Sequence, residues 1–269
     1  MKILELFGGI GACSKALERL GIEYEIADYV EIDKYAVKSF NAIHNTNFEP
    51  QDICTWDKDI EVDLIMHGSP CQDFSLAGKQ AGGDKDSGTR SSLMYETIRI
   101  VGKLKPKYVI WENVKNLLSK KHRHNFDAYL ETMEQLGYTN YYQVLNAKDY
   151  GIPQNRERVF TISIRKDIDK GSFCFQQKQE LKLKLKDLLE DNVDEKYYLS
   201  VESAKKIKYN NIESDHFNIK NATKKGYLAA YPGDGCYIQN INRKRGTVQK
   251  NMIPTLKTSP DVGVVVNDN

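Results

Sequence analysis

Residues 4–17 read LELFGGIGACSKAL and place Gly8, Gly9 and Gly11 between an apolar strand pattern and a segment with helical spacing. Such a turn lets backbone N–H groups and a helix N-terminus approach a ligand closely, as in the nucleotide sites of doubly wound folds. The spacing differs from GxGxxG, so it does not favour a dinucleotide. The alternative interpretation is a tight connection without a ligand.

The strand–helix alternation continues over the first 165 residues, which is typical of βαβ units. Strands are expected at residues 3–7, 24–30, 62–67, 108–111 and 159–164, and helices at residues 12–20, 33–43, 92–104 and 125–136. The pattern predicts an α/β fold with a Rossmann-like, doubly wound, mostly parallel sheet. From about Phe175 onward Lys, Asn and Tyr become frequent and the periodicity weakens. We therefore expect one domain over residues 1–174 and a smaller, loop-rich lobe over residues 175–269.

The composition limits the class of protein. With 40% hydrophobic and 28% charged residues the chain is an ordinary globular protein, and no apolar run approaches the roughly 20 residues that span a bilayer. The N-terminus lacks the pattern of a secretory signal, so a cytoplasmic protein without a membrane partner is expected. The cysteines number 5 and include no CxxC pair, which favours neither a disulfide framework nor a metal site.

The net charge of +2 does not identify a partner, but basic residues gather between Lys178 and Lys257. This distribution leaves two interpretations open, a nucleic-acid surface and a plain solvated face.

Acidic residues follow the second strand and the next loop. Glu31 comes at the carboxyl end of the second strand, where an acid accepts hydrogen bonds from ribose hydroxyls. Ile32 beside it is suited to an adenine face, and Asp52 to an adenine amino group. The alternatives are a surface carboxylate or a helix cap, the role for which Asp33 is well placed.

Cys71 lies in the stretch VDLIMHGSPCQDFS, residues 62–75, where a buried strand pattern leads into a Gly-Ser-Pro turn. This turn puts the thiol at the carboxyl edge of the sheet, where doubly wound folds have their sites. A thiolate nucleophile is one interpretation and a buried, inert cysteine is the other. The other cysteines lack this setting.

Two further groups follow strand patterns. KYVIWENVKNLL, residues 107–118, ends its apolar run in Glu112, which can share a crevice with Cys71 and act as an acid. An ion pair with Lys115 is the structural alternative. Arg156 and Arg158 stand two apart ahead of the last strand, so both can point to one face and bind carboxylates, phosphates or carbonyl oxygens. A plain surface pair is the alternative there.

Taken together, these motifs resemble the cytosine-5 DNA methyltransferases of bacterial and phage type, as found in restriction–modification systems. The matching blocks are LFGGIG at 6–11, GSPCQDFS at 68–75, ENV at 112–114 and QNRER at 154–158, in the family's order. The resemblance covers most of residues 1–165. FSLAGKQ after the cysteine is more similar to the DNA enzymes than to their transfer-RNA relatives.

The resemblance implies a reaction. Cys71 adds to carbon 6 of a cytosine flipped out of duplex DNA. Glu112 contacts ring nitrogen 3, and Arg158 holds the 2-carbonyl oxygen. Carbon 5 receives the methyl group of S-adenosylmethionine, leaving S-adenosylhomocysteine, and Cys71 departs. No metal is implied.

The resemblance also implies binding residues and the S-adenosylmethionine-dependent methyltransferase fold. The cofactor contacts carried over are Phe7, Gly9, Ile10, Gly11, Glu31, Ile32, Asp52, Ile53 and Leu93. The loop from Gln72 to Arg90 resembles the family's DNA-clasping loop, with Ser75 and Arg90 as phosphate contacts and Arg156 in support. The lobe over residues 175–269 is then the target-recognition lobe.

Three hypotheses stay open from the sequence: an active DNA methyltransferase, a DNA-binding or regulatory subunit, and an RNA methyltransferase. The recognition sequence is not predicted. After IPTLKTSPDVGVVVNDN, residues 253–269, the family's closing blocks and final helix are missing. We therefore expect a truncated chain, a natural deletion, or the larger subunit of a split enzyme that needs a complementing C-terminal chain.

Overall fold

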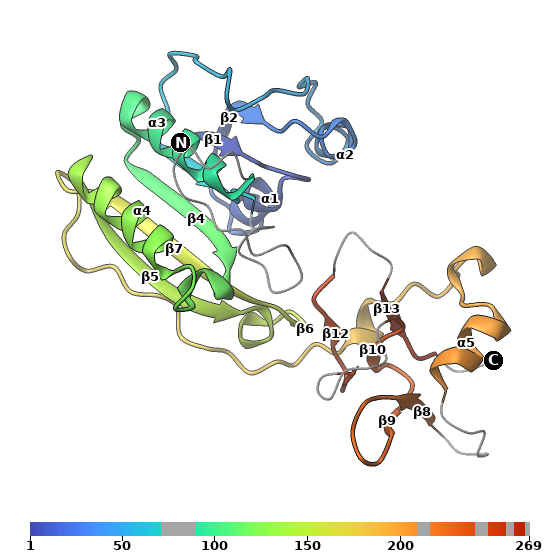
Figure 1. Ribbon diagram of the computed structural model, residues 1–269. Helices are drawn as coiled ribbons and strands as arrows, with labels where there is room; N and C mark the ends of the chain where they lie inside the picture. The colour runs from blue at the N-terminus through green and yellow to red at the C-terminus, as the bar shows by residue number, and fades with distance from the viewer. Residues whose placement is uncertain (71–89, 209–215, 240–246, 257–260, 267–269) are drawn as a thin grey trace. The chain divides into compact units, whose positions relative to one another are not determined.

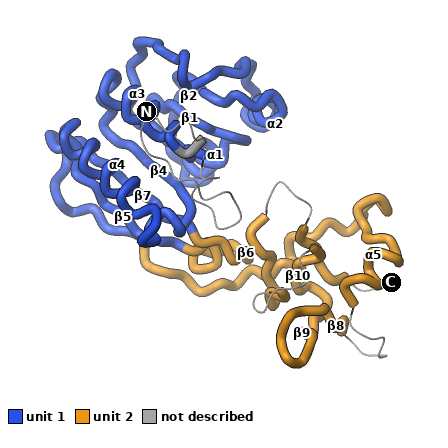
Figure 2. Tube along the Cα trace, viewed as in Figure 1, with its two compact units in different colours: residues 1–145, 158–175 blue, residues 146–157, 176–269 orange. Residues whose placement is uncertain are grey.

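The computed structural model describes residues 1–70, 90–208, 216–239, 247–256 and 261–266. The chain folds into two compact units, residues 1–145 with 158–175 and residues 146–157 with 176–269 (Figure 2). Residues 146–157, which contain most of the LNAKDYGIPQNRER stretch, thus leave the first unit and join the second. The assignment of a catalytic and a target-recognition role to two domains stays a prediction.

A six-stranded sheet forms the centre of the first unit, in the order β2-β1-β3-β4-β7-β5 (Figure 1). β1 pairs in parallel with β2 and β3, and β3 with β4, whereas β7 is antiparallel to β4. The predicted doubly wound, mostly parallel sheet is therefore confirmed. Its strands are β1 (Lys2–Leu6), β2 (Glu25–Val30), β3 (Leu64–His67), β4 (Tyr108–Val114), β5 (Tyr138–Asn146) and β7 (Glu157–Arg165).

Helices cover both faces of this sheet because consecutive side chains of its central parallel strands are apolar and point to opposite faces. Leu4 and Ile65 pack with the cluster that contains α3 and α4, and Ile3 and Leu64 pack with Leu17 of α1. α2 packs its own apolar side chains against β2. The helices are α1 (Ala12–Arg19), α2 (Lys34–His44), α3 (Met94–Leu104) and α4 (Arg123–Gln135), with 3₁₀ turns η1 (Arg90–Leu93) and η2 (Lys115–Leu118).

Side-chain chemistry explains where α2 begins and ends. The carboxylate of Asp33 accepts hydrogen bonds from the backbone N–H groups of Tyr35 at 2.8 Å and Ala36 at 3.2 Å, the arrangement of an N-cap. Asn45 ends the helix in the left-handed region, with φ 51°. The sequence-based interpretation of Asp33 as a helix cap is confirmed.

Two strands differ from the sequence-based expectation. β4 continues to Val114, three residues beyond the expected end at Trp111, because β7 pairs with it as far as Val114 opposite Arg158. Glu112 and Asn113 therefore lie within the strand. β5 was not expected, since YTNYYQVLN has too many polar residues for a buried-strand pattern and only Tyr138 in it is buried.

The second unit consists of short elements. Ile253–Pro254 (β12) pairs in parallel with Gln154–Asn155 (β6), so residues 146–157 are built into this unit by backbone hydrogen bonds. The remaining elements are η3 (Ala147–Tyr150), η4 (Leu185–Leu188), η5 (Glu195–Tyr197), α5 (Val201–Ile207), β8 (Phe217–Lys220), β9 (Tyr227–Ala230), β10 (Gly235–Tyr237), β11 (Val248–Gln249) and β13 (Val262–Val264). Within the described ranges, no helix has the length and apolar character needed to cross a membrane.

Candidate active site

The glycine turn after β1 requires glycine for two different reasons. Gly11 has φ 82°, and a Cβ there would meet the side chains of His44 and Phe40. Gly9 has φ 55°, but in the described part of the chain no atom beyond its two sequence neighbours lies within 4 Å of where its Cβ would stand. Gly11 is therefore required for packing against α2, whereas Gly9 leaves open space beside the loop.

Hydrogen bonds from residues at the end of β2 hold the same turn. The Tyr29 hydroxyl donates to the Gly9 carbonyl oxygen at 2.6 Å, and the Gly9 N–H donates to Glu31 Oε2 at 3.1 Å. The other carboxylate oxygen of Glu31 accepts the Asp33 N–H at 3.0 Å. A carboxylate has about four acceptor positions, so Glu31 retains capacity for ribose hydroxyls.

Glu5 is a supporting residue that the sequence reasoning missed. Its carboxylate is buried and accepts hydrogen bonds from the Ser14 N–H at 2.8 Å and from the Ser14 hydroxyl, at the first turn of α1. Burial raises the pKa of Glu5. It caps a helix whose N-cap, Gly11, has no side chain. The available signal was a single acid within an apolar strand.

The predicted cofactor-contacting residues differ in exposure. The side chain of Ile32 is 67% exposed, which leaves an apolar surface for a ligand, whereas Ile53 is 4% exposed and belongs to the core. Asp52 accepts the Cys54 N–H at 2.9 Å, so its carboxylate is oriented by its own turn. Phe7 and Leu93 pack at the margin of the core, and Ile10 is exposed.

The turn that leads to the predicted nucleophile is anchored to β4. Trp111 Nε1 donates to the Ser69 hydroxyl at 3.0 Å, and Asn113 Nδ2 donates to the Ser69 carbonyl oxygen at 3.3 Å. Ser69 is buried and stands two residues before Cys71. Cys71, Gln72 and Ser75 lie outside the described residues, and Arg90 begins η1 with a side chain that the structure does not describe.

Glu112 and Arg158 form an ion pair at the carboxyl edge of the sheet. Arg158 Nε lies 2.9 Å from Glu112 Oε1, with the two side chains 17% and 30% exposed. A Cβ on Gly68, three residues before Cys71, would lie 3.9 Å from Glu112 Oε2. The structure thus brings together two of the predicted catalytic groups beside the turn that precedes the third.

Arg156 and Arg158 fall in different units. Arg158 is on β7 in the first unit, whereas Arg156 lies between β6 and β7 in the second, where its N–H donates to Asn146 Oδ1 at 3.1 Å. Their shared orientation stays a prediction.

A buried histidine, also missed from the sequence, ends β3. The His67 ring stacks on Trp111 with centroids 5.7 Å apart, and its Nε2 lies 3.3 Å from the Tyr129 hydroxyl. Its Nδ1 has no hydrogen-bond partner within the described structure. Burial lowers the pKa of His67 to about 3, so the ring is neutral near pH 7.

Burial makes two other cysteines poor nucleophiles. It raises the pKa of Cys13 to about 12 and that of Cys236 to about 11, and these thiols stay protonated near neutral pH. Among the described residues, no group of three or more His, Cys, Asp or Glu is placed to hold a metal ion.

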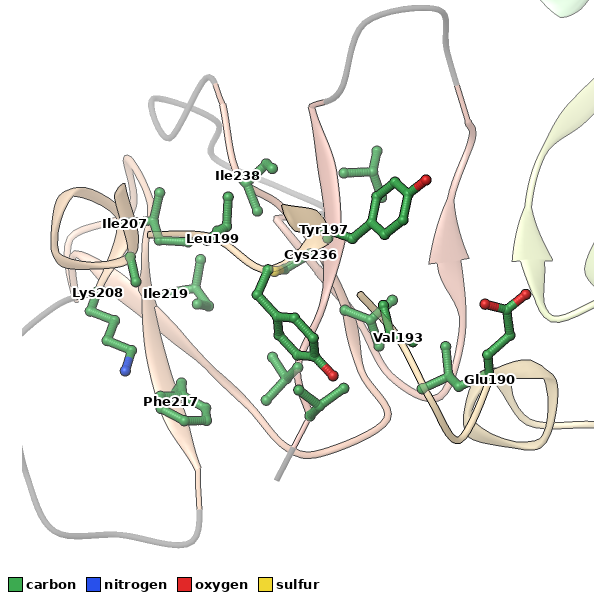
Figure 3. A pocket seen from close by; sticks show the side chains of 18 of the residues that line it. Glu190, Val193, Tyr197, Leu199, Ile207, Lys208, Phe217, Ile219, Cys236 and Ile238 are labelled. Atoms are coloured by element: carbon green, nitrogen blue, oxygen red, sulfur yellow. The ribbon is translucent and has the colours of Figure 1, made fainter. Parts of the chain in front are cut away.

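Cys236 also lines a pocket of about 610 Å³ in the second unit (Figure 3). Most of its lining is apolar, with Ile207, Ile219 and Val265 among the side chains. None of the predicted site residues that the structure describes lines it.

Comparisons with known proteins agree on one family. Residues 1–262 match the family described as C-5 cytosine-specific DNA methylase. The type II methyltransferase M2.ScrFI of Lactococcus lactis subsp. cremoris is 38% identical over 254 residues, covering 74% of this chain and 70% of that protein. The orphan methyltransferase M.SPRI of Bacillus phage SPR is 38% identical over 232 residues, and the match covers 74% of this chain and 52% of the length of M.SPRI.

Solved structures agree on the fold. A DNMT2 variant of Spodoptera frugiperda has a TM-score of 0.61 at 24% identity, and the match covers 77% of this chain and 66% of the DNMT2 chain. A putative DNA modification methyltransferase of an Escherichia coli prophage has a TM-score of 0.57 at 23% identity, and the match covers 72% of this chain and 56% of the prophage protein. The chain therefore belongs to the C-5 cytosine-specific DNA methylase family, whose members are transferases that methylate cytosine in DNA with S-adenosylmethionine.

Proposed function

We propose that this chain is a DNA (cytosine-5)-methyltransferase that acts on a cytosine flipped out of duplex DNA through a covalent Cys71 adduct. The observation that carries the proposal is the Glu112–Arg158 ion pair beside Gly68, at the carboxyl edge of the sheet. A carboxyl group and a guanidinium placed together can meet a ring nitrogen and the neighbouring carbonyl oxygen of one base.

The residues around the glycine turn fit S-adenosylmethionine. The open space beside Gly9 admits a ligand close to the backbone, and the exposed Ile32 side chain offers an apolar surface to adenine. Glu31 would accept from the ribose hydroxyls and Asp52 from the adenine amino group. When bound, S-adenosylmethionine supplies the methyl group to carbon 5 and leaves as S-adenosylhomocysteine.

The protein residues activate the base before that transfer. The Cys71 thiol gives up its proton to water, and its sulfur forms a bond to carbon 6 while the electrons of the 5,6 double bond move toward carbon 5. Glu112 shares a proton with ring nitrogen 3, and Arg158 donates to the 2-carbonyl oxygen, so both stabilise the charge that develops in the ring.

The adduct is resolved by elimination. The proton on carbon 5 leaves to water, the double bond forms again, and Cys71 departs as a thiolate. The proton on ring nitrogen 3 returns to Glu112 and the thiolate takes a proton back from water, so the protein ends the cycle as it began and one proton is released overall. Ser69, held by Trp111 and Asn113, supports a fixed position for the attacking cysteine.

Methyl transfer to duplex DNA and to transfer RNA tests the proposal. Radioactive methyl groups should appear in 5-methylcytosine of DNA and not in transfer RNA. Transfer confined to RNA would favour the RNA methyltransferase instead. DNA and cofactor binding without transfer would favour the regulatory subunit.

The same assay tests the expectation that a complementing C-terminal chain is needed. The chain is assayed alone and with the C-terminal third of M2.ScrFI as a separate polypeptide. Stimulation would support the split arrangement, whereas full activity of the single chain, unchanged by the fragment, would contradict it.

We also propose that residues 175–269 carry target recognition. Exchanging this segment with that of a relative should change the DNA sequence that is methylated to the one that the relative methylates. Bisulfite sequencing of a plasmid identifies the methylated cytosines directly. A methylated sequence that stays unchanged would contradict this role. DNA affinity should fall steeply with salt if the lysines between Lys178 and Lys257 meet phosphates.

A further inference from the structure

The loop that carries Asp52 and Ile53 is held on one side by a buried acid. Asp28 on β2 is 3% exposed and accepts hydrogen bonds from Trp56 Nε1 at 2.8 Å, Lys58 Nζ at 2.7 Å and Gln51 Nε2 at 2.9 Å. Both ends of the loop are therefore fixed to the second strand.

On its other side the loop is held by an arginine of α3. Nη2 of Arg99 donates to the carbonyl oxygen of Ile53 at 3.0 Å and to that of Trp56 at 2.9 Å. Nε of the same guanidinium donates to Glu96 Oε2 at 2.7 Å, which fixes the plane of the group. Two nitrogens of one planar guanidinium thus join Glu96 to two backbone carbonyls on the loop, an arrangement that the single nitrogen of a lysine does not reproduce.

This bridge acts one residue away from Asp52. The Ile53 carbonyl is fixed by Arg99, and the Ile53 side chain is fixed in the core. The Asp52 carboxylate in turn accepts the Cys54 N–H at 2.9 Å. Loss of Arg99 would remove the charged donor from both carbonyls and leave the Ile53 carbonyl only the Trp56 N–H, so the turn that orients Asp52 would be held less firmly.

We propose that Arg99 is a positioning residue for cofactor binding, which holds Asp52 where it recognises the amino group of adenine. The inference rests on the proposed function and names a residue that touches neither cofactor nor base. Because Arg99 acts on the loop and not on the reacting atoms, its loss should weaken cofactor binding while turnover at saturating cofactor is preserved.

The direct test is calorimetric binding of S-adenosylhomocysteine to the full chain. Arg99→Met should raise Kd by about 10-fold or more, since two carbonyls lose their charged donor, and Arg99→Lys should fall between it and the wild type. Lys107→Met is the matched control, because it also removes one positive charge. Lys107 forms a surface ion pair with Asp63 just before β4 begins, at the end of the strand away from Glu112. The Kd of Lys107→Met should stay within about twofold of wild type.

A second ligand separates positioning from a general loss of stability. S-inosylhomocysteine carries a carbonyl oxygen in place of the adenine amino group, so it should bind the wild type about 10-fold or more weakly than S-adenosylhomocysteine. In Arg99→Met and Arg99→Lys this ratio should shrink, whereas in Lys107→Met it should not. If Arg99→Met fails to fold, the ratio in Arg99→Lys decides.

The outcomes distinguish the two proposals. Absence of S-adenosylhomocysteine binding by the wild-type chain would contradict the proposed function. Wild-type binding with an unchanged ligand ratio in both Arg99 variants would overturn the role of Arg99 alone. A lowered melting temperature with unchanged Kd values would likewise show that Arg99 contributes to the stability of the fold and not to cofactor binding.

Discussion

Arg158 Nε and Glu112 Oε1 lie 2.9 Å apart on adjacent antiparallel strands, where Arg158 stands opposite Val114. In the absence of a nucleobase, the Glu112 carboxylate and the Arg158 guanidinium neutralise each other's charge. A cytosine that enters this site would have to compete with the ion pair, and the same two side chains would then face its ring nitrogen and carbonyl oxygen.

Glu112→Gln should lower the rate of methyl transfer by about 10²-fold or more, because an amide cannot share a proton with ring nitrogen 3 in the same way. Arg158→Lys should lower it as well, since a lysine keeps the charge and loses the planar fork. Single-turnover kinetics with saturating DNA measures both. Near-normal rates in either variant would remove that residue from the mechanism.

Ser69→Ala and Trp111→Phe should each slow the chemical step by about 10-fold, because the turn before Cys71 loses the same hydrogen bond in both. The double variant should be no slower than the slower single variant. Comparison of kcat with the Kd for DNA isolates the effect on chemistry. Additive effects of the two substitutions would show that they act separately.

His67 should make stability depend on pH. Its folded pKa of about 3 lies below the ordinary value of 6.5, so the unfolded chain binds the additional proton between these values. Stability contributed by the neutral ring is complete above about pH 6.5 and is lost as the pH falls toward 3. At pH 5 the loss should be about 2 kcal/mol.

His67→Phe tests this dependence, because it keeps a ring beside Trp111 and removes the titrating nitrogens. Urea unfolding at pH 7 and pH 5 should give a smaller difference for the variant than for the wild type. An equal difference in both proteins would assign the acid sensitivity to other groups.

Gly9→Ala and Gly11→Ala should separate binding from folding. At Gly11 a Cβ meets His44 and Phe40, so alanine should lower the free energy of unfolding by about 1–3 kcal/mol. At Gly9 the space is open, and alanine should cost only about 1 kcal/mol for its backbone conformation. Its methyl group should nevertheless weaken S-adenosylhomocysteine binding. Wild-type affinity in Gly9→Ala would contradict the proposed cofactor position.

Local patterns were sufficient to predict every strand of the sheet except β5, and part of the site. Short apolar runs indicate β1 to β4, and parallel strands bring Glu31, Gly68 and Glu112 to one edge. The Glu112–Arg158 pair was beyond local reasoning, because it depends on the register of an antiparallel strand 46 residues later in the chain.

Supporting residues were the least predictable. Glu5 and Arg99 act through backbone groups of other segments, and nothing in the neighbouring sequence shows which carbonyl or N–H they meet. Residues 146–157 join the second unit through β6 and β12, a pairing of two-residue strands that has no periodic signal.

The central claim is that Cys71 forms a covalent bond to carbon 6 of a cytosine in duplex DNA. The most direct measurement uses duplex DNA that contains 5-fluorocytosine, in which the fluorine on carbon 5 blocks the final elimination. With S-adenosylmethionine present, the wild-type chain should form a complex that survives denaturing electrophoresis and yields a Cys71–DNA peptide by mass spectrometry, and Cys71→Ser should form none. A trapped complex of equal yield in Cys71→Ser, or a wild-type chain that methylates DNA but is never trapped, would contradict the account.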